Sequence, residues 1–318
     1  MSTARPFHVA ISGQIGSGKS SVARRLAERL DAQFYSTGGI QREIAKQRGM
    51  TTLELNLFAE KNPEIDREID GFTQALDASE DSFVIDSRLA WNFLGSAFKV
   101  NLLVDHGVAV ERIMGDRRRG ATEAYGSRKE GIEEVAARRA SERRRFLEKY
   151  GVDVENPRNF DLIVDTTQAS VDEAVDIVHR SLLAAHDSGS EGPRHGLWLC
   201  PRTLFPTRHF SEIRETADAL AEAGATPEAV EPSGVQVMIV DGLTYLLDGH
   251  ARISAAIRAG QALVAGELVA TGDEEASLGI SARHYVADRS TARCVDAWEH
   301  AHGLRFSRRG PGSEDSPG

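Results

Sequence analysis

Residues 7–20 read FHVAISGQIGSGKS, and this stretch decides the fold of the first half of the chain. The apolar run Phe7–Ser12 precedes a segment that matches G-x-x-x-x-G-K-[ST] in full, and an amphipathic helix is predicted over Lys19–Leu30. A strand, a glycine-rich loop and a helix in this order form a loop whose N–H groups face phosphate oxygens. The predicted phosphate-binding residues are Gly13, Gly16, Ser17, Gly18, Lys19, Ser20 and Ser21.

The side chains of this loop predict ATP and Mg²⁺ as ligands. Lys19 would reach the β- and γ-phosphates, and the Ser20 hydroxyl would bind the metal. Asp86 ends the apolar run Ser82–Asp86, and a carboxylate at that strand end is expected beside the loop as a second metal ligand. The alternative is that Asp86 only caps the turn that follows its strand.

Short apolar runs alternate with helical patterns as far as about residue 185. Helix starts are indicated by the capping-box pattern Thr51-x-x-Glu54 and by Asn62-Pro63. Strands that alternate with helices predict right-handed crossovers, and therefore an α/β domain with a five-stranded parallel sheet covered on both faces. The expected strands are 7–12, 33–35, 82–86, 98–105 and 161–165.

Arginines are concentrated in two places. Arg88 follows Asp86 by two residues, where a guanidinium could bind an acceptor phosphate, and ten arginines lie between Arg112 and Arg145. A mobile arginine-rich flap suits phosphoryl transfer, because the transition state spreads negative charge over several oxygens. Alternatively, the glutamates of this stretch could pair with the arginines on a solvated helix face. We expect two or three of these arginines to be catalytic.

The composition changes after residue 186. Residues 187–195 contain a polar Gly/Ser/Pro linker, a small α+β domain is predicted over 196–306, and the Gly/Pro-rich tail 307–318 is expected to be disordered. Within the second domain, Asp241-Gly242 predicts a hairpin turn. The stretch Asp248–Arg252 (DGHAR) then opens a helix with Asp248 as the expected N-cap. The predicted anion site comprises Asp248, Gly249, His250 and Arg252; the alternative is that Asp248 only caps and Arg252 only pairs with a carboxylate.

Composition excludes several classes of protein. The 38 basic and 48 acidic residues give a net charge of −10, which argues against non-specific nucleic-acid binding. The two cysteines, Cys200 and Cys294, form no C-x-x-C pair, so a zinc knuckle or disulfide framework is not expected, and reduced thiols fit a cytoplasmic protein. No apolar run is long enough for a membrane span, and no signal peptide is evident. The oligomeric state is left open.

Residues 7–185 resemble the cytidylate kinase-like branch of the nucleoside monophosphate kinases, especially the short archaeal type. The matching segments are ISGQIGSGKSSVARRLAERL, STGGIQREIAKQRGM, NPEIDREID, VIDSRLAW, SERRRFLEKYGVD and FDLIVDT. The resemblance implies Mg²⁺- and ATP-dependent phosphorylation of a nucleoside monophosphate, with CMP or dCMP as the first candidate acceptor. It implies a catalytic set of Lys19, Arg88, Arg143 and Arg145, with Arg112 a weaker candidate. The implied acceptor residues are Ser36, Gly38, Arg42, Asp66 and Arg88, with Asp70 nearby. The alternative for Asp66 and Asp70 is an exposed helix face.

The chain departs from this family at two points. Gln14-Ile15 stands where the family's loop usually has small residues or proline, and these positions contribute backbone N–H groups in either case. Gly39 stands where the family often has Asp, which removes a polar group beside the expected acceptor.

Residues 197–270 resemble the ParB/sulfiredoxin-like superfamily through D-G-H-x-R and the small-residue helix after it, and this resemblance implies phosphate or nucleotide binding. Two other functions stay open: a kinase for an unusual phosphorylated metabolite, and a nucleotide-gated regulatory or DNA-associated protein.

Overall fold

The computed structural model describes residues 6–50, 58, 62–115, 127–187, 196–222, 234–277 and 279–306. Several predictions lie outside these residues: the capping box at Thr51, most of the linker, the tail 307–318 and the arginines at 117–119. The side chains of Arg42, Asp66 and Arg138 also lie outside the described part.

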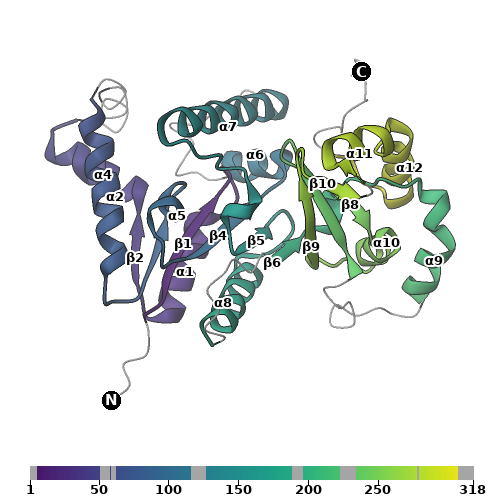
Figure 1. Ribbon diagram of the computed structural model, residues 1–318, viewed down its shortest axis with the longest axis horizontal. Helices are drawn as coiled ribbons and strands as arrows, with labels where there is room; N and C mark the ends of the chain where they lie inside the picture. The colour runs from purple at the N-terminus through teal and green to yellow at the C-terminus, as the bar shows by residue number, and fades with distance from the viewer. Residues whose placement is uncertain are drawn as a thin grey trace. The chain divides into compact units, whose positions relative to one another are not determined.

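The sheet has nine strands, in the hydrogen-bonded order β2-β3-β1-β4-β5-β6-β9-β7-β8 (Figure 1). The five predicted strands are all present, but the prediction of a five-stranded sheet is wrong, because four strands after residue 195 belong to the same sheet. A strand at the edge of a sheet leaves N–H and C=O groups unpaired, and added strands satisfy them. The pairs β1–β3, β1–β4 and β2–β3 are parallel, whereas β6–β9 and β7–β8 are antiparallel.

The chain divides into two compact units. Unit 1 comprises residues 1–102, 159–162 and 170–194, and unit 2 comprises residues 103–158, 163–169 and 195–318. The predicted domain limits at residues 186 and 196 stay a prediction.

Unit 1 contains the strand–loop–helix start of the chain. Its buried strands follow from apolar sequence: all six residues of β1 and all four of β3 are buried. In α1, Val22 and Leu26 face the core at the i, i+4 spacing of an amphipathic helix. Asn62 is the N-cap of α4 and Pro63 its first residue, as predicted. Its elements are β1 (His8–Gly13), α1 (Lys19–Leu30), β2 (Gln33–Ser36), α2 (Thr37–Gln47), α4 (Pro63–Ala75), η1 (Leu76–Ala78), β3 (Phe83–Asp86), α5 (Ala90–Phe93), β4 (Phe98–Leu103, whose last residue is in unit 2) and α8 (Val171–Asp187).

Unit 2 contains the arginine-rich helix α7 and the C-terminal segment, by which we mean the described residues from 196 to 306. Ser127 caps α7 by accepting a hydrogen bond from the Glu130 amide, and the helix ends at Gly151 in the left-handed conformation. Its helices are α6 (His106–Gly115), α7 (Arg128–Tyr150), η2 (Pro157–Asn159, whose last residue is in unit 1), η3 (Pro201–Thr203), α9 (Phe210–Glu222), α10 (His250–Arg258), α11 (Ala282–Arg289) and α12 (Ala292–His302). Its strands are β5 (Leu162–Asp165, whose first residue is in unit 1), β6 (Gly196–Leu199), β7 (Gln236–Val240), β8 (Leu243–Asp248), β9 (Val264–Thr271), β10 (Glu275–Ser277) and β11 (Ile280–Ser281).

The C-terminal segment has a core of its own. Met238, Tyr245 and Val286 are almost fully buried and bring β7, β8 and α11 together. The Asp241-Gly242 hairpin is confirmed: β7 and β8 pair antiparallel, and both turn residues have positive φ. Among the described residues, no helix is both long and apolar enough to span a bilayer.

Candidate active site

The phosphate-binding loop lies between the end of β1 and the start of α1. Gly13 touches β4 so closely that a Cβ there would lie 2.7 Å from the Leu102 carbonyl oxygen and 2.9 Å from Ser17 Oγ. The Gln14 amide donates to the same Leu102 oxygen at 3.0 Å, which fixes the loop against the sheet. No side chain caps α1, whose N-cap is Gly18. The Ser21 amide donates to the Gly18 carbonyl oxygen at 2.9 Å. A helix start of this kind can bind an anion through its first amides.

Lys19 and Ser20 both bind the carboxylate of Asp86. Lys19 Nζ lies 2.6 Å from Asp86 Oδ1, and the Ser20 hydroxyl donates to Asp86 Oδ2 at 2.5 Å. Asp86 is 5% exposed, so the ion pair with Lys19 compensates a carboxylate that is shielded from water. These contacts confirm that Asp86 lies beside the loop, 66 residues from Ser20 in sequence.

The carboxyl ends of three parallel strands meet at this point. Asp86 pairs in register with Ile11 of β1 and with Ser36 of β2, so the predicted acceptor residue Ser36 lies next to Asp86. In open parallel sheets, ligands bind outside such strand ends. The register therefore supports an acceptor position beside the phosphate loop, and the acceptor role of Ser36 and Gly38 stays a prediction.

The backbone around Arg88 is tightly held. Its carbonyl oxygen accepts hydrogen bonds from the Ser12 hydroxyl at 3.2 Å and from Trp91 Nε1 at 2.9 Å. The Ser87 hydroxyl accepts from the amides of Leu89 and Ala90. The Arg88 side chain is half-buried, directly after the strand end that carries Asp86. Asp70 is half-buried on α4.

The predicted arginines of unit 2 bind protein oxygens. The Arg143 guanidinium binds both carboxylate oxygens of Asp153, at 2.8 and 2.6 Å, and also reaches Glu155 at 3.2 Å. The hydrogen bond to Asp153, together with the charges of Glu155 and Asp153, raises the pKa of Arg143. Arg145 lies over the ring of Phe146. The flap roles of Arg143 and Arg145 stay a prediction.

Arg112 supports the end of β5. Its guanidinium donates to the carbonyl oxygens of Thr166, at 2.6 Å, and Thr167, at 3.3 Å. Burial lowers the pKa of Arg112, and the charge of Asp165 opposes that shift. Asp165 is itself buried, and burial raises its pKa although the hydroxyls of Thr167 and Thr203 donate to it.

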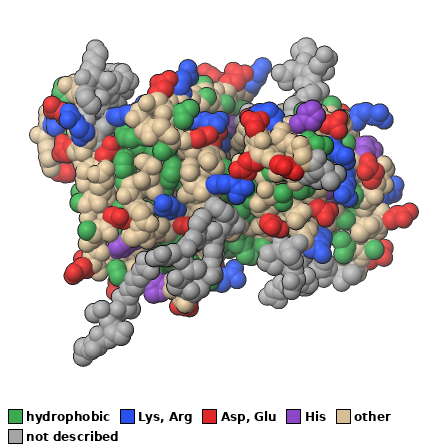
Figure 2. All heavy atoms as spheres, viewed as in Figure 1, with side chains coloured by type: hydrophobic (Ala, Val, Ile, Leu, Met, Phe, Trp, Pro, Cys, Tyr) green, Lys and Arg blue, Asp and Glu red, His purple; other side chains and the backbone are tan. Residues whose placement is uncertain are grey.

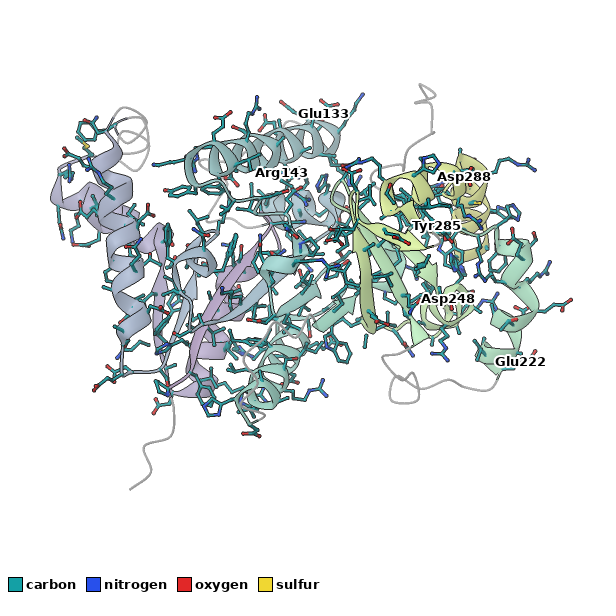
Figure 3. All side chains as sticks on the ribbon, viewed as in Figure 1. Glu133, Arg143, Glu222, Asp248, Tyr285 and Asp288 are labelled. Carbon is teal, nitrogen blue, oxygen red and sulfur yellow. The ribbon has the colours of Figure 1, made fainter. Side chains whose placement is uncertain are left out.

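The DGHAR stretch adopts a geometry that differs from the prediction in one respect. Helix α10 begins at His250 with Gly249 as its N-cap, so the prediction that Asp248 is the N-cap is wrong. Figure 3 labels Asp248. Gly249 has φ of 89°, and a Cβ there would lie 2.5 Å from the Gly234 carbonyl oxygen. Asp248 instead ends β8, is exposed, and lies 4.0 Å from Arg208.

His250 faces the interior of the C-terminal segment. It is 2% exposed, and its Nε2 accepts from the Thr207 amide at 3.1 Å. Burial lowers the pKa of His250 to about 4, so the ring is neutral at pH 7 and brings no positive charge to an anion. The guanidinium of Arg252 lies against the backbone of Gly234. Anion binding at Asp248, Gly249, His250 and Arg252 stays a prediction.

On the face shown in Figure 2, basic and acidic side chains are mixed together. Among the described residues, no group of three or more His, Cys, Asp or Glu side chains has metal-site geometry. The half-buried His302 packs against Trp298, with 4.5 Å between the two ring centroids.

Comparison with known proteins identifies the first half of the chain. Residues 8–168 match the Cytidylate kinase-like family. The chain belongs to this family. A cytidylate kinase of Aeropyrum pernix is 40% identical over 168 residues, which cover 53% of this chain and 94% of that protein. A cytidylate kinase of Pyrococcus furiosus is 35% identical over 187 residues, covering 58% and 93%.

Two further proteins are similar to parts of this chain. An S-adenosylmethionine-dependent nucleotide dehydratase of Lacinutrix mariniflava is 34% identical over 171 residues, which cover 54% of this chain and 34% of that protein. Among solved structures, shikimate kinase from Acinetobacter baumannii aligns with a TM-score of 0.38 and 14% identity, covering 59% of this chain and 97% of that structure. The cytidylate kinase-like family supports a kinase that acts on a nucleotide or another small molecule. The ParB/sulfiredoxin-like resemblance of the C-terminal segment stays a prediction.

Sequence reasoning missed two acidic partners in the cytidylate kinase-like region. Asp153 and Glu155 follow α7 and bind Arg139 and Arg143. Burial would raise the pKa of Asp153, but the hydrogen bonds from Arg143 and from the Glu155 amide outweigh it and lower that pKa. The available signal was a pair of acids just beyond a helix C-terminal glycine, where the chain turns back along the helix.

Proposed function

We propose that this protein transfers the γ-phosphoryl group of ATP to a nucleoside monophosphate, with CMP or dCMP as the first candidate acceptor. The observation that carries the proposal is the convergence of Lys19 and Ser20 on Asp86 at the ends of β1 and β3. Transfer of phosphate from a nucleoside triphosphate requires this arrangement: a phosphate-binding loop with a lysine and a hydroxyl, and a carboxylate at a neighbouring strand end.

The donor atoms at this point fit Mg²⁺. Ser20 Oγ and Asp86 Oδ2 are hard oxygen ligands that lie 2.5 Å apart and bind each other here. When bound, Mg²⁺ would neutralise charge on the β- and γ-phosphates. Lys19 would exchange its contact with Asp86 for the phosphates, and the amides at the start of α1 would orient them.

The proposed reaction is a direct in-line transfer. An oxygen of the acceptor phosphate forms a bond to the γ-phosphorus while the bond from that phosphorus to the β–γ bridging oxygen breaks, and ADP leaves. The attacking oxygen is already anionic, so no strong general base is needed. Catalysis then rests on positioning by the loop and on charge neutralisation by Lys19, Arg88, Arg143 and Arg145.

The relatives favour a nucleotide acceptor. Two of the relatives named above are cytidylate kinases, and a third is a nucleotide dehydratase. The position of Ser36 opposite Asp86 supports an acceptor beside the loop.

A coupled assay of ADP release over CMP, dCMP, UMP and AMP tests the proposal. We expect the highest kcat/KM with CMP or dCMP. Lys19→Ala should lower kcat by about 10³-fold or more while circular dichroism stays unchanged. Arg25→Ala is the matched control, because it removes another cation of α1, one that pairs with Asp172 at the surface, and it should keep wild-type activity. Wild-type turnover by Lys19→Ala would contradict the site, and activity that appears only with DNA would favour the regulatory alternative.

A further inference from the structure

An ion-pair cluster joins α7 to the segment after it. Arg139 Nε binds Glu155 Oε1 at 2.5 Å, and these two side chains are 19% and 18% exposed. Arg143 binds Asp153 with two hydrogen bonds and also reaches the second oxygen of Glu155. Glu155 therefore holds both arginines at once.

The turn of the β7–β8 hairpin covers this cluster. A Cβ on Gly242 would lie 3.2 Å from Arg139 Nη2 and 3.5 Å from Glu155 Oε2, and Gly242 has φ of +73°. Any side chain at this position would be strained and would crowd the ion pair, so glycine permits the close approach. The negative charge of the neighbouring Asp241 also raises the pKa of Arg143, by less than Asp153 and Glu155 do.

A second turn of the C-terminal segment contacts the same region. Glu274, in the turn between β9 and β10, binds Arg158 with two hydrogen bonds of 2.9 and 2.8 Å. The two turns are connected by Arg283 of α11, which binds Asp241 at 2.5 Å and Asp273 at 3.0 Å. The hairpin turn and the Glu274 turn therefore form one surface, which we call the docking surface.

We propose that the docking surface is an intramolecular clamp: it holds Glu155 against Arg139 and Arg143 and so restrains the arginines of α7. An arginine that already binds carboxylates must release them before it can bind phosphate oxygens, because the two kinds of oxygen compete for the same five N–H donors. Docking therefore lowers phosphoryl transfer, and undocking raises it. The effect on turnover rests on the proposed function; the docking does not.

A charge-swap experiment on the full chain tests both parts. The variants are Glu274→Arg, Arg158→Glu and the double swap, with hydrogen exchange measured over peptides from α7 and ADP release measured on the same samples. An exposed ion pair is worth up to about 1 kcal/mol, so each single variant should increase the undocked population about fivefold. We expect faster exchange in α7 and a higher kcat in both single variants, and wild-type values in the double swap. Arg258→Glu is the control, since it breaks an ion pair with Asp218 elsewhere in the same segment.

Each outcome decides one part. Unchanged exchange in the single variants, or a double swap that fails to restore it, overturns the docking. Faster exchange with unchanged or lower kcat overturns the restraint on the α7 arginines. Faster exchange in a protein that phosphorylates no nucleotide supports the docking and overturns the proposed function alone.

Discussion

His250 makes the stability of the C-terminal segment depend on pH. Its imidazole accepts a hydrogen bond from the Thr207 amide, so the neutral ring carries its proton on Nδ1, a buried atom with no hydrogen-bond partner in the described structure. Protonation would place a charge at a buried position, so burial, together with the charge of Arg208, lowers the pKa from 6.5 to about 4. The unfolded chain binds the proton more readily than the folded chain between these two values.

The sign and size of the effect follow from this difference. Because the pKa of the folded state is the lower one, the stabilisation is fully present above pH 6.5 and is lost as the pH falls towards 4. A difference of about 2.5 pKa units corresponds to about 3 kcal/mol of unfolding free energy. A loss of that size is a large fraction of the stability of an ordinary domain.

Urea unfolding of wild type and His250→Gln, followed by tryptophan fluorescence at pH 7, 6, 5 and 4.5, measures this contribution. Gln can still accept from the Thr207 amide but does not titrate, so its unfolding free energy should fall with decreasing pH by about 2 to 3 kcal/mol less than that of wild type. Other titrating groups are common to both proteins and cancel. Ser254→Ala, one turn further along α10, is the control and should keep the wild-type pH dependence. Equal pH dependence in wild type and His250→Gln would refute the assignment of a buried neutral ring.

Three further predictions concern a buried hydrogen bond and the space around two glycines. Thr203→Val removes the 2.7 Å hydrogen bond to the buried carboxylate of Asp165, and should lower the unfolding free energy by about 1 to 3 kcal/mol in urea; an unchanged midpoint would show that the carboxylate does not need this donor. Gly13→Ala forces a Cβ against the Leu102 carbonyl oxygen, so binding of a fluorescent ATP analogue should weaken at least tenfold. Wild-type affinity for the analogue would contradict this prediction. Gly71→Ala, at a helical position with open space around it, should instead stabilise the fold by about 0.5 to 1 kcal/mol.

The parts of the structure that local chemistry determines could be predicted from the sequence. The glycine spacing and the apolar run before it place Lys19 at the start of α1, and parallel strand ends bring Asp86 to it. Asn62-Pro63 and Asp241-Gly242 likewise determine a helix start and a turn, because each restricts its own backbone.

The remaining features depend on contacts between distant residues. The N-cap of α10 was predicted one residue early, at Asp248, because only the close approach of Gly234 reveals that Gly249 must be the N-cap. The alternative for the arginines of α7 was pairing with glutamates along their own helix, but Arg139 and Arg143 bind acids that follow Gly151. The sheet was predicted too small because the addition of β6 and its neighbours leaves no local pattern.

The position of β3 between β1 and β2 separates two tasks in this protein. Lys19, Asp86 and Ser36 are fixed by neighbouring strand ends, whereas the residues that connect β2 to β3 leave the sheet and return to it. Changes of length or composition in that connection leave the strand register intact, as they do in surface loops generally. Selectivity for the molecule that receives the phosphate can therefore diverge during evolution while the machinery that handles the triphosphate stays the same.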